Sequence, residues 1–142
     1  STIYRSPFAH GVNTCYAPLL LRKDMLDQLA FLKEYCGFRT VRCHGIFHDH
    51  IGVASRGERR RLEFHFELAH KVYDNLLDIG LRPHIELSFL PRVLAADPNR
   101  TCCYYQAHVS QPRLYAEWSQ LVAAFSRSLS DATAAANGRL AI

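Results

Sequence analysis

The sequence contains no two cysteines in a C-x-x-C spacing, and its cysteine count, five, is odd. Small folds held together by disulfides carry their cysteines in pairs, and structural zinc sites use closely spaced ones. Both classes are therefore disfavoured, and a reducing compartment is the simpler interpretation. Cys36 and Cys43 stand among apolar residues and are expected to be small core side chains.

Long apolar runs are also missing. No stretch approaches the roughly 18 residues that a membrane-spanning helix requires, so neither a membrane segment nor a membrane partner is expected. The chain begins at Ser1 and shows no signal peptide, which favours a cytoplasmic location without excluding secretion. A start without Met is also typical of a processed or excised piece of a longer protein.

Positive charge is in small excess only. The formal net charge is +4, and nearly all of the positive charge comes from arginine. The densest basic run, Arg56 to Arg61, contains Gly57 and is expected to be a solvated loop. Such a distribution is not typical of a nucleic-acid-binding protein, and no nucleic-acid partner is expected.

The apolar residues alternate between helical and strand-like spacing along the chain. Met25, Leu29, Leu32 and Cys36 recur at helical intervals, and Gly37 follows as a stop signal. By the same reasoning the sequence predicts three helices, over Leu19–Cys36, over Phe64–Ile79 and from Pro112 onwards. It also predicts three strands, over Phe8–Asn13, over Phe38–Cys43 and between Leu81 and Leu90. The segments Gly45–Glu63 and Arg92–Gln111 are expected to be long loops.

This alternation predicts an α/β fold with a parallel sheet and right-handed crossovers. The strand-to-helix loops are long and polar and the helix-to-strand joins are short, which fits a (β/α)8 barrel with its site on one face. Such a barrel needs about 250 residues. We therefore expect residues 1–142 to form a single partial domain, the first three to four βα units of a barrel. Residues 126–142 are expected to be a poorly ordered or atypical tail, with a fourth strand starting near Gly138.

Polar residues end two of the expected strands. Arg42 and His44 close one, and Glu86 and Ser88 close the next. Strand alternation puts each pair on one face, and ligands of α/β folds bind at the carboxyl ends of strands. We expect Arg42 and Glu86 to lie within ion-pair distance, with His44 the more exposed of the two residues on its strand. The alternative is structural: Glu86 is only the counter-charge that permits burial of Arg42.

A second candidate site is the histidine-rich stretch after this strand. His44, His48, Asp49 and His50 are of the types that bind zinc, manganese or iron. Their spacing matches no metal signature, so hydrogen bonding within the loop is the alternative.

Aromatic residues are candidates to stack on a sugar ring. Phe89 and Tyr105 fall in expected loops and suit this role. Trp118 lies on an apolar helical stripe and is expected in the core.

Several short motifs, in order from about Gly11 to about Phe125, resemble glycoside hydrolase family 39, which includes β-xylosidases and α-L-iduronidases. They are Arg42-Cys43-His44-Gly45 with His48-Asp49, Tyr73-Asp74 with Gly80-Leu81-Arg82-Pro83, Glu86-x-x-Phe89-x-Pro91-x-x-Leu94-Ala95, and Pro112-x-x-Tyr115-x-x-Trp118.

The resemblance implies a (β/α)8 barrel that cleaves a glycosidic bond with retention, using two glutamates and no cofactor or metal. In family members the acid/base Glu follows an Asn at the end of the fourth strand, and the nucleophile lies on the seventh. No Asn of this chain is followed by Glu, so neither catalytic residue is expected here and the chain alone is expected to be inactive. By the same resemblance, the substrate-binding residues are His44, Arg42, Glu86, Phe89 and Asp49.

The expected partner is a carbohydrate, a xyloside-like glycoside. A second copy or a companion chain is also expected, because half a barrel leaves two sheet edges open. His65 and the pair Tyr104–Tyr105 depart from the family, which often has Asn and commonly a Trp there, and so leave the sugar preference open. Two other function classes stay open: a non-catalytic carbohydrate-binding or scaffold piece, and a metal-dependent barrel enzyme using His44, His48, His50 and Glu86.

Overall fold

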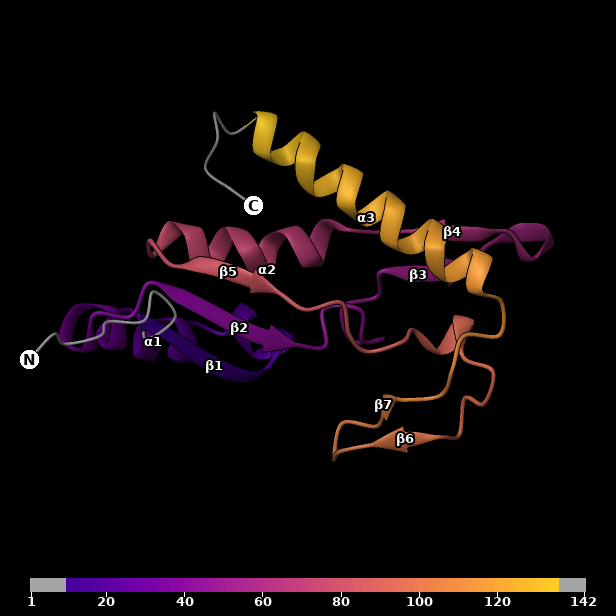
Figure 1. The fold of residues 1–142 in the computed structure, drawn as a ribbon, viewed down its shortest axis with the longest axis horizontal. Helices are drawn as coiled ribbons and strands as arrows, with labels where there is room; N and C mark the ends of the chain where they lie inside the picture. The colour runs from indigo at the N-terminus through magenta and orange to yellow at the C-terminus, as the bar shows by residue number, and fades with distance from the viewer. Residues whose placement is uncertain (1–9, 136–142) are drawn as a thin grey trace, which may run out of the picture.

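Three parallel strands form the central sheet of the computed structural model, which describes residues 10–135 (Figure 1). They are β1 (Gly11–Tyr16), β2 (Thr40–His44) and β5 (Arg82–Ile85), in the order β1-β2-β5. β2 pairs in parallel with both neighbours. The expected parallel sheet is confirmed. The first strand lies later than expected, and Phe8 and Ala9 are outside the described residues.

A bulge shifts the register at the end of β1, between Thr14 and Tyr16. After the bulge, Tyr16 is the residue opposite His44. A bulge re-aims the side chains that follow it, and here the pairing puts a tyrosine beside the polar end of β2.

Three helices follow the three strands: α1 (Lys23–Cys36), α2 (Glu67–Asp78) and α3 (Tyr115–Ala135). A short 3-10 helix, η2 (Ala17–Leu21), precedes α1, and the extended backbone of Arg22 separates the two. The single helix expected over Leu19–Cys36 is therefore two pieces. α1 ends where Gly37 adopts a left-handed conformation, φ 72°, which glycine adopts readily.

The core lies between the sheet and the helices. Val41 and Cys43 of β2 are buried there, in one cluster with Leu29 of α1 and Val72 and Leu76 of α2. Complete burial of such an aliphatic side chain stabilises the fold by about 1.5–3 kcal/mol. The residues of β2 that alternate with Val41 and Cys43 therefore belong to the opposite face of the sheet.

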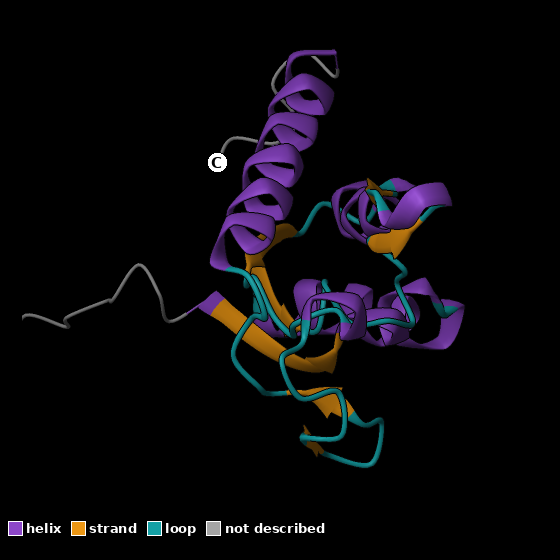
Figure 2. Ribbon diagram, turned by 90° about the vertical axis from the view of Figure 1, so that its right-hand side faces the viewer, coloured by secondary structure: helices purple, strands orange, loops and turns teal. Residues whose placement is uncertain are grey.

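Both segments expected to be loops contain short hairpins, so that expectation is wrong in part. β3 (Ala54–Arg56) pairs with β4 (Leu62–Phe64), and β6 (Thr101–Cys102) pairs with β7 (Ala107–His108), both antiparallel. The 3-10 helices η3 (Glu58–Arg60) and η4 (Arg92–Leu94) lie in the same segments. Strands this short leave no alternation long enough to recognise in a sequence. Figures 1 and 2 both show the β6–β7 hairpin at the lower edge of the molecule and α3 at the upper edge.

The long helix α3 continues through the Ser/Ala-rich stretch as far as Ala135, where the sequence predicted a loss of order. Leu121, Phe125 and Leu129 are buried along one side of it. Trp118 packs edge-on against Phe47, 5.7 Å between ring centroids, so its expected place in the core is confirmed. Residues 136–142, with the expected fourth strand, lie outside the described part. No helix within residues 10–135 is both long and apolar enough to cross a membrane.

Candidate functional site

The polar ends of β2 and β5 form one group of side chains, which we name the strand-end cluster: Arg42, His44, Glu86, Ser88 and Phe89. Arg42 and His44 alternate with the buried Val41 and Cys43 and therefore leave the sheet on the face away from the helices. Figure 1 shows β1, β2 and β5 all pointing toward the side on which the β6–β7 hairpin lies. The cluster thus occupies the carboxyl ends of parallel strands, as the sequence predicted.

Arg42 and Glu86 form the expected ion pair. Arg42 Nη1 also donates to Asn13 Oδ1 at 3.1 Å, so the guanidinium joins residues of all three strand segments. The relative exposure of Arg42 and His44 is the reverse of the prediction: the Arg42 side chain is 47% exposed, whereas His44 is half-buried. The reason is the β6–β7 hairpin, whose Tyr105 covers His44.

Ser88 fixes the position of Glu86. Its hydroxyl donates to Glu86 Oε1 at 2.8 Å and accepts from the backbone N–H of Gly45 at 3.1 Å. The Ser88 carbonyl accepts from the N–H of Phe47 at 2.8 Å, and the peptide bond from Ser88 to Phe89 is cis. The hydrogen bonds from Gly45 and Phe47 to Ser88 hold the residues that follow β5 against those that follow β2.

Aromatic rings surround His44. Its Nε2 lies 2.7 Å from the Tyr105 hydroxyl, and the ring of Phe89 meets it edge-on at 5.6 Å between centroids. Tyr105 in turn stacks on Tyr16 at 4.2 Å with the ring planes 9° apart. Burial lowers the pKa of His44, and nearby Arg42 lowers it further while Glu86 opposes both. The neutral imidazole, one donor and one acceptor, is therefore favoured.

A chain of hydrogen bonds continues from Tyr16 into the histidine-rich loop. The Tyr16 hydroxyl lies 2.8 Å from His48 Nδ1 and 2.6 Å from His50 Nδ1. His48 Nδ1 also accepts from the backbone N–H of His50, so the proton of the neutral ring is on Nε2, which donates to the Tyr105 carbonyl at 2.8 Å. Burial lowers the pKa of His48 and raises that of Tyr16 to about 12. Both groups are therefore uncharged near neutral pH.

Of the two interpretations of this histidine-rich stretch, the structure favours hydrogen bonding, to Tyr16 and Tyr105 outside the loop as well as to the His50 N–H within it. His48 uses both ring nitrogens in the bonds just described. Among residues 10–135, no group of three or more His, Cys, Asp or Glu side chains is placed to hold a metal ion.

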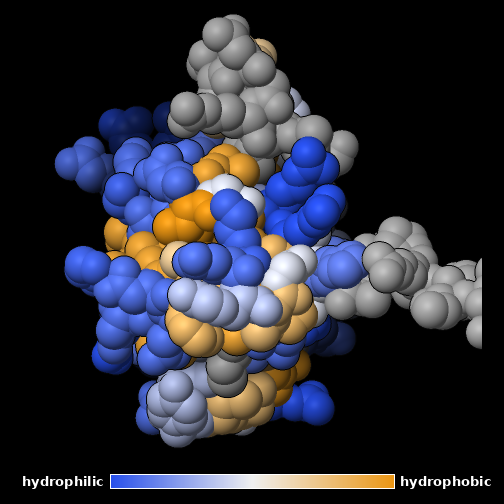
Figure 3. All heavy atoms as spheres, turned by 90° about the vertical axis from the view of Figure 1, so that its left-hand side faces the viewer, coloured by the Kyte–Doolittle hydropathy of each residue, from blue (hydrophilic) through white to orange (hydrophobic). Residues whose placement is uncertain are grey.

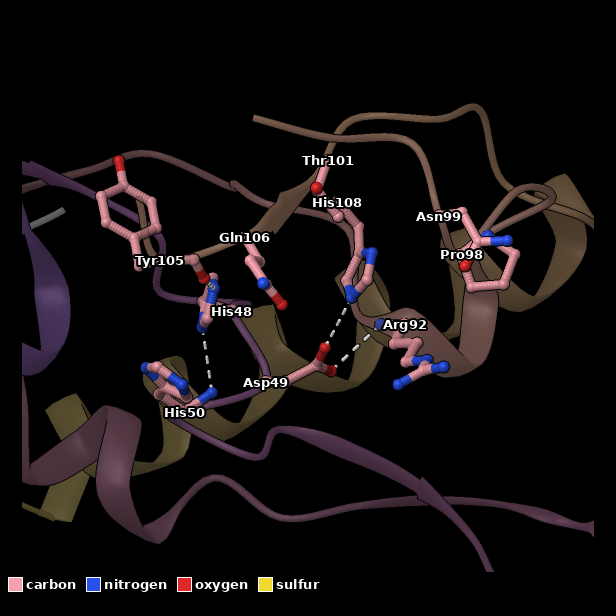
Figure 4. Close-up of a pocket in the computed structure, with 10 residues that line it drawn as sticks. All are labelled: His48, Asp49, His50, Arg92, Pro98, Asn99, Thr101, Tyr105, Gln106 and His108. Carbon is pink, nitrogen blue, oxygen red and sulfur yellow. Dashed lines mark hydrogen bonds and ion pairs between the residues drawn. The ribbon is translucent and has the colours of Figure 1, made fainter. Parts of the chain in front are cut away.

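A pocket, which we name the loop pocket, adjoins the strand-end cluster (Figure 4). Its volume is about 380 Å³, and ten mostly polar residues line it: His48, Asp49, His50, Arg92, Pro98, Asn99, Thr101, Tyr105, Gln106 and His108. Tyr105 borders both the pocket and the cluster.

Asp49 lies in the loop pocket and not in the strand-end cluster. Figure 4 shows its carboxylate turned toward His108 and the backbone of Arg92. Its Oδ1 accepts from the backbone N–H of Arg92 at 3.0 Å, and its Oδ2 lies 3.0 Å from Nε2 of the buried His108. Asp49 thus joins its own loop to η4 and β7.

The structure adds three residues to the candidate site that were not predicted from the sequence. Asn13 ended the expected first strand, so a strand-end position was its available signal. Tyr16 lies beyond that expected end and His108 fell in an expected loop, so neither carried a signal. Tyr105 was selected as a stacking candidate, but one face of its ring is already occupied by Tyr16.

Comparison with known proteins gives the same fold. The profile of Glycosyl hydrolases family 39 matches residues 3–132. A β-xylosidase from Caldicellulosiruptor saccharolyticus is 36% identical over 122 residues, which are 86% of this chain and 25% of that protein. A β-xylosidase from Geobacillus stearothermophilus is 32% identical, covering 80% of this chain and 23% of that protein.

The crystal structure of a monomeric β-xylosidase from Caulobacter crescentus CB15 superimposes with a TM-score of 0.78 and 31% identity, covering 84% of this chain and 24% of that one. The parallel βαβ units thus match the N-terminal part of the family's (β/α)8 barrel, and the predicted fold class is confirmed. This chain spans about a quarter of the length of these relatives. It belongs to glycosyl hydrolases family 39.

Proposed function

We propose that the chain is the N-terminal part of a retaining glycosidase that acts on β-xylosides, and that its strand-end cluster is one wall of the sugar subsite. The observation that carries this is the Arg42–Glu86 pair beside a neutral His44 at the carboxyl ends of three parallel strands. Two relatives that share this part of the chain are β-xylosidases by name.

Each residue of the cluster has a role in this proposal. His44 hydrogen-bonds a sugar hydroxyl, exchanging or sharing its bond with the Tyr105 hydroxyl. Phe89 offers a ring face to the sugar. Arg42 and Glu86 set the charge of the wall, and Asp49 positions the loops through which the rest of the substrate passes.

Glu86 is not a catalytic carboxylate in this proposal. It is engaged by Arg42 and Ser88, whereas an acid catalyst must hold a proton and a nucleophile must reach the anomeric carbon. Both catalytic glutamates come from later strands of a complete barrel. The 142-residue chain alone is therefore expected not to hydrolyse aryl xylosides. Turnover above the rate in buffer without the protein, in a preparation free of other glycosidases, would contradict this.

A chimera tests the function itself. Residues 3–132 replace the matching segment of the β-xylosidase from Caldicellulosiruptor saccharolyticus, and hydrolysis of p-nitrophenyl β-D-xyloside is measured. We expect activity, and a fall in kcat/KM of roughly 5- to 150-fold in the His44→Ala chimera, the cost of about 1–3 kcal/mol for one lost hydrogen bond.

The matched control is His10→Ala, since His10 is exposed at the opposite end of β1. A cooperatively unfolding chimera that is inactive, or one that keeps full activity without His44, would overturn the proposal. Thermal unfolding monitored by circular dichroism separates either result from a failure to fold.

A further inference from the structure

The β6–β7 hairpin brings two adjacent cysteine side chains together. Cys102 is the last residue of β6, and the Sγ atoms of Cys102 and Cys103 are 3.5 Å apart. Neighbouring side chains of an extended strand point to opposite sides. Here Cys103 has φ 63°, and the N–H of Gln106 donates to its carbonyl at 3.2 Å to close a turn. The turn therefore folds the second thiol back over the first.

The two thiols differ in access. Cys103 is exposed and Cys102 is half-buried. Burial, together with the hydrogen-bonded contact with the Cys103 thiol, raises the pKa of Cys102. Thiolates, not thiols, attack disulfides, so Cys103 is the residue that a reagent in solution meets first.

We propose that Cys102 and Cys103 form a reversible modification site that closes to a disulfide between adjacent residues on exchange with a low-molecular-weight disulfide such as oxidised glutathione. The Cys103 thiolate attacks the external disulfide, forms a mixed disulfide and releases one glutathione thiolate. Cys102 loses its proton to solvent and attacks Cys103 Sγ, which releases the second glutathione. Two protein thiols are oxidised to one disulfide, and one external disulfide is reduced to two thiols.

The disulfide would affect the strand-end cluster through the backbone that joins Cys103 to Tyr105. Tyr105 follows two residues after Cys103, with its hydroxyl at His44 and its carbonyl at His48 Nε2. Closing a small ring across the Cys102–Cys103 peptide constrains the backbone that positions Tyr105. Oxidation therefore changes the surroundings of His44, whichever substrate the cluster binds.

Peptide mapping tests the site. Trypsin cleaves after Arg100 and Arg113, so the peptide spanning residues 101–113 contains both cysteines and no other. After incubation of the reduced chain with oxidised glutathione, we expect this peptide to be lighter by two hydrogens and to carry no glutathione. A Cys36→Ser variant, which lacks another exposed thiol, should give the same product.

Closure should also be faster in the native chain than in urea, because the turn holds the sulfur atoms together. A peptide that carries two glutathiones, is linked to another peptide, or stays reduced while Cys36 reacts would overturn the site. Equal closure rates in urea and in buffer would overturn the role of the turn. An NMR titration of His44 that is identical in the reduced and oxidised chains would overturn the coupling to Tyr105.

Discussion

At the residue scale, Arg42 is tied to both neighbouring strand segments, through Asn13 and Glu86. The arginine side chain stays positively charged in a protein and is the cation that pairs with Glu86. Replacing Arg42 therefore leaves the Glu86 carboxylate without its partner. We expect Arg42→Ala to lower the free energy of unfolding by about 1 kcal/mol and not more, since the 47% exposed side chain is screened by water. Urea unfolding measures the change.

The control for this prediction is Arg22→Ala, which removes an exposed ion pair with Asp24 at the start of α1. Its effect should be smaller than that of Arg42→Ala, and raising the salt concentration should weaken the Arg22–Asp24 pair more than the less exposed Arg42–Glu86 pair. Equal effects of the two substitutions would contradict a structural role for the Arg42–Glu86 pair.

His48 makes stability depend on pH. Burial lowers its pKa in the folded chain, whereas the unfolded chain has the ordinary value of about 6.5. As the pH falls through that value, His48 binds a proton in the unfolded state but not in the folded state. Protonation therefore stabilises the unfolded state, and the free energy of unfolding falls. We expect this loss to begin as the pH falls through about 6.5 and to continue down to the lowered pKa of folded His48, with His44 adding to it because its pKa is also lowered.

Urea unfolding at several pH values measures this dependence. His48→Gln should weaken it, because the glutamine amide does not titrate, and His10→Gln at an exposed position should leave it unchanged. A pH dependence that is the same in His48→Gln as in the unchanged chain would show that another group is responsible.

At the scale of elements, Phe125 is the centre of an aromatic contact between α3 and the core. Phe125 lies 5.0 Å from Phe47 and 5.3 Å from Phe66, centroid to centroid, and is completely buried. Removal of a buried phenyl ring costs about 3–5 kcal/mol through lost burial and the cavity left behind. Phe125→Ala should lower the free energy of unfolding by that amount, whereas Tyr115→Ala, 65% exposed on the same helix, should change it little. If Phe125→Ala and Tyr115→Ala both changed the free energy of unfolding only slightly, α3 would not be packed on the core.

The elements also show what a sequence can and cannot reveal. The helices and sheet strands could be predicted because their apolar periods persist over several residues, as in Met25, Leu29 and Leu32. The Arg42–Glu86 pair could be predicted because parallel neighbours and strand alternation place both on one face. The Tyr105–His44 contact could not, because it depends on a hairpin with two-residue strands and on a left-handed turn at Cys103.

At the scale of the whole molecule, the three-stranded sheet has two open edges. Within residues 10–135, β1 and β5 each pair on one side only. The rings of Phe31 and Tyr35 contact each other on the exposed side of α1, with centroids 4.4 Å apart and planes tilted by 32°. Apolar surface also reaches the face on which the strands begin (Figure 3). Open strand edges and uncovered apolar surface both promote association.

We therefore expect the isolated chain to self-associate in a concentration-dependent way in analytical ultracentrifugation. Phe31→Ser with Tyr35→Ser should reduce the association if α1 contributes to it, and Tyr104→Ser, at an exposed position in the β6–β7 turn, is the control. A chain that sediments as one monomeric species at all concentrations and unfolds cooperatively would contradict this prediction.

The contact between His44 and Tyr105 spans 61 residues of sequence, and the bond from Gly45 to Ser88 spans 43. A contact between distant residues forms only after the loop between them has closed, at a cost in chain entropy that rises slowly with loop length. During synthesis, β2 leaves the ribosome long before the hairpin that covers its end. The imidazole of His44 is therefore exposed to water while β2 pairs with its neighbours, and Tyr105 covers it only when the β6–β7 hairpin has formed.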